Sequence, residues 1–105
     1  MSRVIAHLHP SKSAGTQPAT VTCATGSTAL LAASSGSGYT YILLQNTGAN
    51  DVYVDLTGAT PTVGGGFLLA ANGGSLELVH WVPQVAINGI ADSGSSTVEV
   101  LYTGG

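Results

Sequence analysis

The feature that most constrains this sequence is a series of short segments in which apolar residues alternate with polar ones. The clearest is "DVYVDL" (51–56), where Val52, Val54 and Leu56 fall on one face of an extended chain. Residues typical of turns, mainly Gly, Asn, Asp and Ser, separate such segments about every 8–12 residues. This spacing predicts an all-β fold, an antiparallel β-sandwich or a jelly-roll-like barrel.

Within this fold we expect strands over residues 20–25, 39–46, 51–56, 66–71, 75–79, 84–91 and 96–102, with 28–33 as a strand or a single turn. Alternation places Leu76 and Leu78 inside with Glu77 outside. In the last strand Val98, Val100 and Tyr102 share the inner face. The turn residues of "NTGAND" (46–51) predict that the strands before and after them pair as a hairpin.

The first part of the chain differs in composition from the rest. Residues 1–19 contain both basic residues of the chain and the connector "PSKSAGTQP", whereas 20–105 are rich in strand patterns. We therefore expect an N-terminal arm and linker over 1–19 and a β-sandwich domain over 20–105. The segment "MSRVIAHLHP" is too short and too polar for a secretory signal.

The low charge of the chain limits the classes of partner. Charged residues make up 7% of the sequence, the net charge is −3, and Lys and Arg together number 2. Nucleic-acid binding needs clustered basic residues, so we expect none. No apolar run reaches the roughly 20 residues that span a bilayer, so we expect no membrane association. A weakly charged surface suits either a protein packed against neighbours or a neutral extracellular domain.

The residues that carry metal or thiol chemistry are few. Cys23 is the single cysteine, which excludes an intrachain disulfide, and we expect it to be a buried apolar residue. His7 and His9 have a spacing compatible with a metal, but only His80, Cys23 and the acidic residues remain as further ligands, at no recognisable spacing. We expect no metal and no cofactor.

No catalytic pattern is complete either. His80 with Asp51, Asp55 or Asp92 is a formal triad candidate, and Glu77 with Asp55 a formal carboxylate pair, but the sequence around them has no nucleophile elbow. The glycine runs lack the lysine of a phosphate loop. We therefore expect no enzymatic activity.

His80 and Trp81 form the most distinctive local feature. Trp81 is the only tryptophan and lies between a predicted strand and Pro83. It is either a lid over the core or an anchor in an interface, where tryptophan is enriched. A platform for sugar stacking is a third interpretation.

Three stretches of the chain, "YILLQNTGANDVYVDL", "GFLLAANGGSLEL" and "VAINGIADSGSSTVEVLY", together resemble a known type of protein. Residues 42–48, 51–55, 66–77 and 85–101 carry the resemblance. The pattern is similar to that of small β-sandwich virion structural proteins of tailed bacteriophages, of the capsid decoration (cement), head-fibre or tail-associated type. In that pattern the last two strands form a hairpin. The first forty residues take no part in the resemblance.

The resemblance implies a decoration protein on the outer capsid, made in the host cytoplasm, that stabilises contacts between major capsid subunits. Its expected partners are the major capsid protein and further copies of itself in a symmetric dimer or trimer. A tail- or head-fibre-associated receptor- or glycan-binding module is the alternative. We expect the arm, docked on the shell or on a neighbouring subunit, and an interface anchor to supply the partner contacts, through Arg3, Val4, Ile5, Leu8, Lys12, His80 and Trp81.

Overall fold

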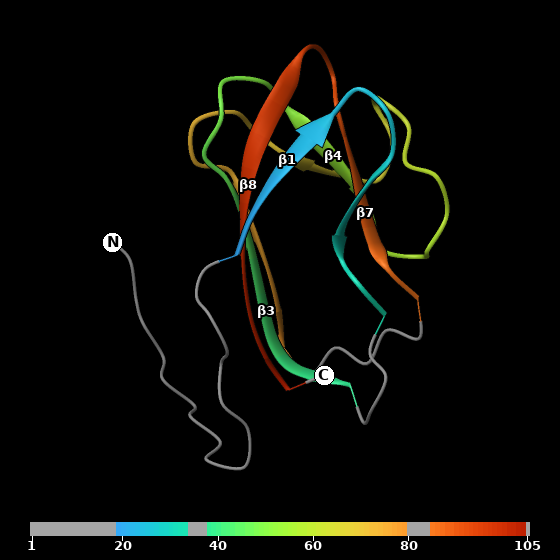
Figure 1. The fold of residues 1–105 in the computed structure, drawn as a ribbon, viewed down its shortest axis with the longest axis vertical. Helices are drawn as coiled ribbons and strands as arrows, with labels where there is room; N and C mark the ends of the chain where they lie inside the picture. Colours follow the sequence, from blue (N-terminus) through green and yellow to red (C-terminus); the bar gives the residue numbers. More distant parts are fainter. Residues whose placement is uncertain (1–18, 34–37, 80–84, 105) are drawn as a thin grey trace.

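The computed structural model describes residues 19–33, 38–79 and 85–104, and all regular structure in these residues is β-strand (Figure 1). The strands are β1 (Ala19–Ala24), β2 (Thr28–Leu31), β3 (Tyr39–Asn46), β4 (Val52–Asp55), β5 (Phe67–Leu69), β6 (Ser75–Val79), β7 (Ile87–Ala91) and β8 (Ser95–Gly104). The segment 28–33, predicted as a strand or a turn, thus contains a strand. Strand β1 begins at Ala19, next to the predicted start of the domain.

The strands form two antiparallel four-stranded sheets. Sheet A has the order β1-β8-β3-β6 and sheet B the order β2-β7-β4-β5. Figure 1 shows β8 running beside β1 and β3, with β4 and β7 belonging to the second layer. Each consecutive pair of strands lies in opposite sheets except β4 and β5, which pair directly. This strand order is that of a jelly roll, so the predicted fold class is confirmed.

The core lies between the two sheets and is made by the alternating inward residues. Sheet A contributes Cys23, Ile42, Leu44, Val98 and Val100, and sheet B contributes Leu69, Val52, Val54, Ile87 and Ala91, all at most 1% exposed. The inward side chains predicted for 51–56 and 96–102 are on this face, with Leu56 and Tyr102 partly buried against it. Because every strand has a period of two, the outward faces of the sheets carry the polar and partly exposed residues.

The predicted hairpin between 39–46 and 51–56 is wrong. Strand β3 pairs with β6 and β8 in sheet A, whereas β4 pairs with β5 and β7 in sheet B. The hairpin that the resemblance implied for the last two strands is wrong in the same way, since β7 and β8 lie in different sheets. In both places the sequence contains a real turn, but the chain uses it to cross between the sheets.

The crossing after β3 is held by the fully buried side chain of Asn46. Its amide nitrogen donates to the carbonyl oxygens of Asn50 (2.7 Å) and Leu69 (2.9 Å). Its amide oxygen accepts from the Ser96 hydroxyl (2.7 Å) and the Gly48 N–H (3.1 Å). One side chain therefore joins β3, the crossing loop, β5 and β8, and all its donors and acceptors are satisfied.

A second crossing, from β5 to β6, lies against the first one. Its turn contains Asn72 and Gly73, with φ of 62° and 122°, values that favour these residue types. The N–H of Asn72 donates to the Gly48 carbonyl (2.8 Å) and the N–H of Gly73 to the Asn46 carbonyl (2.7 Å). The two crossings thus brace each other at one end of the sandwich.

Candidate functional site

The predicted partner-binding residues all lie outside the described residues. Residues 1–18 include Arg3, Val4, Ile5, Leu8 and Lys12, and residues 80–84 include His80 and Trp81. The structure does show what adjoins them. The arm joins the domain at β1, an edge strand of sheet A, and residues 80–84 follow directly on β6, the opposite edge of the same sheet.

Of the formal catalytic candidates, His80 lies outside the described residues, and the two carboxylates of the formal pair are separated. Glu77 is on β6 in sheet A and Asp55 on β4 in sheet B, so the two carboxylates belong to different layers. Asp51 accepts a hydrogen bond from the Ala71 N–H (2.8 Å), which fixes the chain after β5. Residues 19–33, 38–79 and 85–104 contain no group of three His, Cys, Asp or Glu side chains placed to hold a metal.

The thiol of Cys23 on β1 is fully buried between the two sheets, as expected. Burial raises its pKa, a shift that a hydrogen bond with Thr28 partly offsets. A methyl group at Gly89 would approach the Cys23 sulfur to 3.2 Å and Leu30 to 2.8 Å, so this glycine lets β7 pack closely on both side chains. The cysteine is a packing residue of the core.

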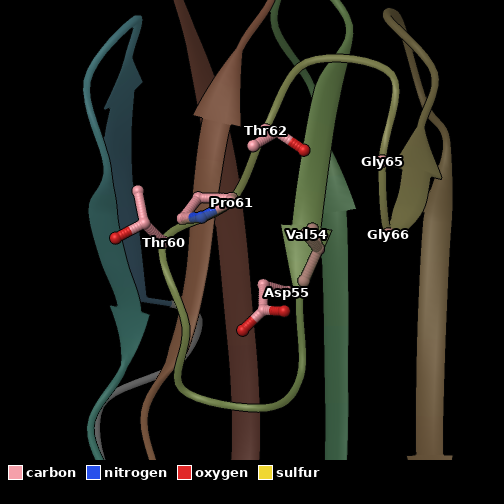
Figure 2. Close-up of a pocket in the computed structure, with 7 residues that line it drawn as sticks. All are labelled: Val54, Asp55, Thr60, Pro61, Thr62, Gly65 and Gly66. Atoms are coloured by element: carbon pink, nitrogen blue, oxygen red, sulfur yellow. The ribbon is translucent and has the colours of Figure 1, made fainter.

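A small pocket of about 50 Å³ lies between the end of β4 and the loop that leads to β5 (Figure 2). Val54, Asp55, Thr60, Pro61, Thr62, Gly65 and Gly66 line it. Figure 2 shows the loop leaving Asp55, passing Pro61 and returning to β5 at Gly66. Ligand pockets usually enclose about 300–1,000 Å³, so this space suits a few water molecules and no substrate.

The Asp55 carboxylate at this pocket is used by its own loop. It accepts hydrogen bonds from the N–H groups of Thr57 (3.0 Å) and Ala59 (2.8 Å) and from the Thr57 hydroxyl. The Asn88 amide on β7 donates to the Ala59 carbonyl (3.2 Å) and ties the loop to the outer face of sheet B. Asp55, a formal catalytic candidate in the sequence, is thus a loop-organising residue in the structure.

The outer face of sheet A is divided into two halves. Toward the β1 side and the crossing loops it carries threonines and two polar strand residues, Thr20, Thr22, Thr97, Gln45 and Glu99. Toward the other end it carries Tyr41, Leu43, Leu101 and Val79, which neighbour one another in the register of β3, β6 and β8. Four apolar or aromatic side chains therefore share one part of this face.

Tyr41 and Glu77 form the polar contact within the apolar half. The Tyr41 hydroxyl donates to Glu77 Oε2 at 2.6 Å. Desolvation of the phenol, followed by this hydrogen bond and by repulsion from the nearby carboxylate, raises the pKa of Tyr41 to about 12. The neutral phenol is the form that this surface stabilises.

Further apolar side chains are exposed on the end strands β5 and β6. Because β1 contacts β2 and β7, the strands at the far ends of the two sheets, β5 and β6, border the opposite side of the sandwich. Phe67 and Leu68 on β5 and Val79 on β6 are 52%, 51% and 58% exposed, with Leu68 on the outer face of sheet B and Val79 on that of sheet A. Leu76 and Leu78 on β6 are partly buried. We call these five residues the β5–β6 edge. It is our candidate functional site, because it holds three of the five large hydrophobic side chains that are exposed in the described residues.

Sequence reasoning missed the β5–β6 edge. Alternation placed Leu76 and Leu78 on the inner face correctly, but it carried no information on where β6 lies in its sheet. The adjacent pair Phe67-Leu68 in a short strand was the available signal, since one of two consecutive strand residues always points away from the core.

Comparison of the chain with protein-family models, with curated proteins and with solved structures found no match. Within the described residues there is also no helix of the length and apolarity needed to cross a membrane.

Proposed function

We propose that this chain is a virion structural protein, a decoration protein of a bacteriophage capsid that binds the outer shell and stabilises contacts between major capsid subunits. It acts as a symmetric homo-oligomer and carries no catalytic site. Its place is the capsid surface, after synthesis in the host cytoplasm. The function is association, and the surfaces that serve it are the arm, residues 80–84 and the β5–β6 edge.

One observation carries this proposal: the described surface offers apolar contact area in place of a ligand cavity. The β5–β6 edge exposes about half of each of three large apolar side chains, and the apolar half of sheet A adjoins it through Val79. By contrast, the pocket beside Asp55 has a volume of only about 50 Å³. A surface of this kind, apolar and poor in charge, is suited to burial against other proteins.

The jelly-roll strand order is in keeping with this role, because the fold is common in viral capsid proteins. The same fold also occurs in lectins and other binding domains, so it does not decide the function by itself. The sequence resemblance to small virion proteins and the low share of charged residues add to the proposal.

The test is the copy number and position of the protein in purified particles from the virus that encodes it. Quantitative mass spectrometry is expected to find the chain in hundreds of copies, and cryo-electron microscopy to show the jelly roll on the outside of the shell. Absence of the chain from particles would refute the virion role. A few copies at the tail or at a head fibre would support the receptor- or glycan-binding alternative instead.

A further inference from the structure

Strand β6 ends sheet A without a neighbour on its outer side. Among the described residues it pairs only with β3, through Ser75–Val79. Half of the backbone N–H and C=O groups of such a strand point away from the sheet, where they can pair with another chain. Proteins usually protect an edge strand with several charges, a proline or a bulge, and β6 has only the charge of Glu77.

The side chains at this edge leave apolar surface that an added strand would cover. Leu76 and Leu78 face the core but remain partly exposed, and Phe67 is half-exposed on the neighbouring edge of sheet B. The other long edge strand of the two sheets, β1, is different. It carries outward threonines and one partly buried valine, Val21.

Charge is divided between the arm and the domain. All five acidic residues follow position 50, at Asp51, Asp55, Glu77, Asp92 and Glu99, while the two basic residues are Arg3 and Lys12. The domain therefore has a formal charge of −5 and the arm +2, which sum to the net charge of −3. An arm of one copy is thus electrostatically attracted to the domain of another.

The arm sequence matches the two sides of the β6 edge. In an extended "RVIAHL" (3–8), Val4, Ala6 and Leu8 share one face, and Arg3, Ile5 and His7 share the other. The first face matches the partly exposed, inward-facing Leu76 and Leu78, and the second brings Arg3 and His7 to the side of Glu77. We propose that residues 3–8 of one copy add to the β6 edge of a second copy as a further strand of sheet A, a mode known as β-augmentation.

A second copy is the favoured acceptor because of where the arm leaves the domain. Ala19 is on β1, three strands away from β6, or about 14 Å across the sheet. To reach its own β6, a chain would have to lay connector 9–18 across the outer face of sheet A, over Leu43 and Leu101, and this polar connector has few apolar side chains to pack against them. Reaching from the β1 edge of one copy to the β6 edge of the next is a heterologous contact, which closes into a ring when the rotation between copies permits.

This inference rests on the self-association within the proposed function and not on the capsid. It is therefore tested with the purified full-length chain, without particles. The oligomeric mass is measured by light scattering and sedimentation, and protection of β6 amides by hydrogen exchange. The variants are Leu8→Asp in the arm, Glu77→Lys on β6, Arg3→Glu, and the double variant Arg3→Glu with Glu77→Lys. Asp92→Lys is the control, with the same change of charge at an exposed turn.

We expect the full chain to be an oligomer with protected β6 amides. Leu8→Asp should weaken association by more than about tenfold, because a buried leucine is lost, and should expose β6 to exchange. Glu77→Lys and Arg3→Glu should each weaken it by roughly threefold or more, the double variant should recover most of the loss, and Asp92→Lys should leave it unchanged. Circular dichroism is to be used to check that each variant is folded. Glu77 is exposed, so we expect its replacement to leave the core intact.

Three results would overturn the inference. The first is a chain that stays monomeric at all concentrations. The second is an oligomer that associates with the same affinity in Leu8→Asp and Glu77→Lys as in the wild type. The third is a monomer in which the β6 amides are protected, which would show that the arm binds its own domain. None of them bears on the presence of the protein in particles, so the virion role is tested separately.

Discussion

Replacing Asn46 by alanine is expected to destabilise the fold more than any other single polar substitution in the described residues. The side chain is 0% exposed and makes four hydrogen bonds, two as donor and two as acceptor. Two of its partners, the Leu69 carbonyl and the Ser96 hydroxyl, belong to residues that are themselves buried. Alanine fills none of these positions and leaves a cavity where the amide was.

The magnitude follows from the partners left behind. A buried polar group without a partner costs about 1–3 kcal/mol, and Ser96 keeps a second, longer contact with the Asn50 N–H (3.4 Å). The Leu69 carbonyl and the Ser96 hydroxyl lose a buried partner, while water can reach the Asn50 carbonyl and the Gly48 N–H in the loop. Together we expect the free energy of unfolding to fall by about 3–5 kcal/mol. A domain of this size is stable by about 5–15 kcal/mol in total, so the variant would keep only part of its stability.

The assay is urea denaturation followed by far-UV circular dichroism, with the free energy of unfolding taken from linear extrapolation. Gln45→Ala is the matched control. Gln45 is the preceding residue, its side chain is exposed, and it makes one long contact of 3.5 Å with the Gly73 carbonyl. We expect less than about 0.5 kcal/mol from this control. If Asn46→Ala costs less than about 1 kcal/mol, the reasoning that the amide holds the crossing together is refuted.

Asn46→Asp separates hydrogen bonding from the loss of volume. The substitution keeps the size of the side chain and its acceptor oxygen, but it turns a carboxylate oxygen toward the carbonyl oxygens of Asn50 and Leu69. Burial and these two acceptors would raise the pKa of the new carboxyl in the folded state, so the variant should gain stability relative to wild type as the pH falls from 7 toward 4. A deficit that does not change over this range would contradict the donor roles assigned to the amide.

Three further outcomes are expected. Gly48→Ala should lower the free energy of unfolding in urea by about 2 kcal/mol or more, because a Cβ there would lie 2.1 Å from Ser96 Oγ and 2.6 Å from the Thr97 backbone nitrogen. Gly26→Ala, with open space around it, is the control and should be neutral or slightly stabilising. Equal effects of the two substitutions would contradict the close approach at Gly48. The folded-state pKa of Tyr41 is raised to about 12 from an ordinary value near 10, so the stability that this tyrosine contributes is complete below pH 10 and declines between pH 10 and 12. Tyr41→Phe should therefore remove the highest step of the tyrosinate absorbance titration. An unchanged titration would refute the assignment. Cys23 should react with a thiol reagent such as Ellman's reagent only at the rate of unfolding, since the thiol is buried and burial raises its pKa; rapid reaction of the native protein would show that the core is open there.

The fold class was predictable because alternation is a local property. The inner faces of 51–56 and 96–102 followed directly from a period of two, and Val52, Val54, Val98 and Val100 lie in the core as expected. Turn positions were predictable for the same reason, since Gly and Asn are needed wherever the backbone takes positive φ, as at residues 72 and 73.

Strand pairing was not predictable, because a turn does not say which strands it joins. The loop after Asn46 reads as a hairpin turn, yet the chain leaves sheet A there and enters sheet B. What decides the crossing is long-range: the Asn46 side chain reaches Leu69, 23 residues on, and Ser96, 50 residues on. The asparagine at the end of an apolar strand was visible in the sequence, but its burial and its partners were not.

The candidate site illustrates the same division between local and long-range information. Alternation identified the inner face of 75–79, and Leu76 and Leu78 do face the core, but β6 has a neighbour on one side only, so both leucines stay partly exposed. The separation of basic residues into the arm and acidic residues into the domain was likewise present in the sequence. It becomes informative only when the structure shows that Glu77 is the single charge of an edge strand, the strand to which we propose that the arm adds.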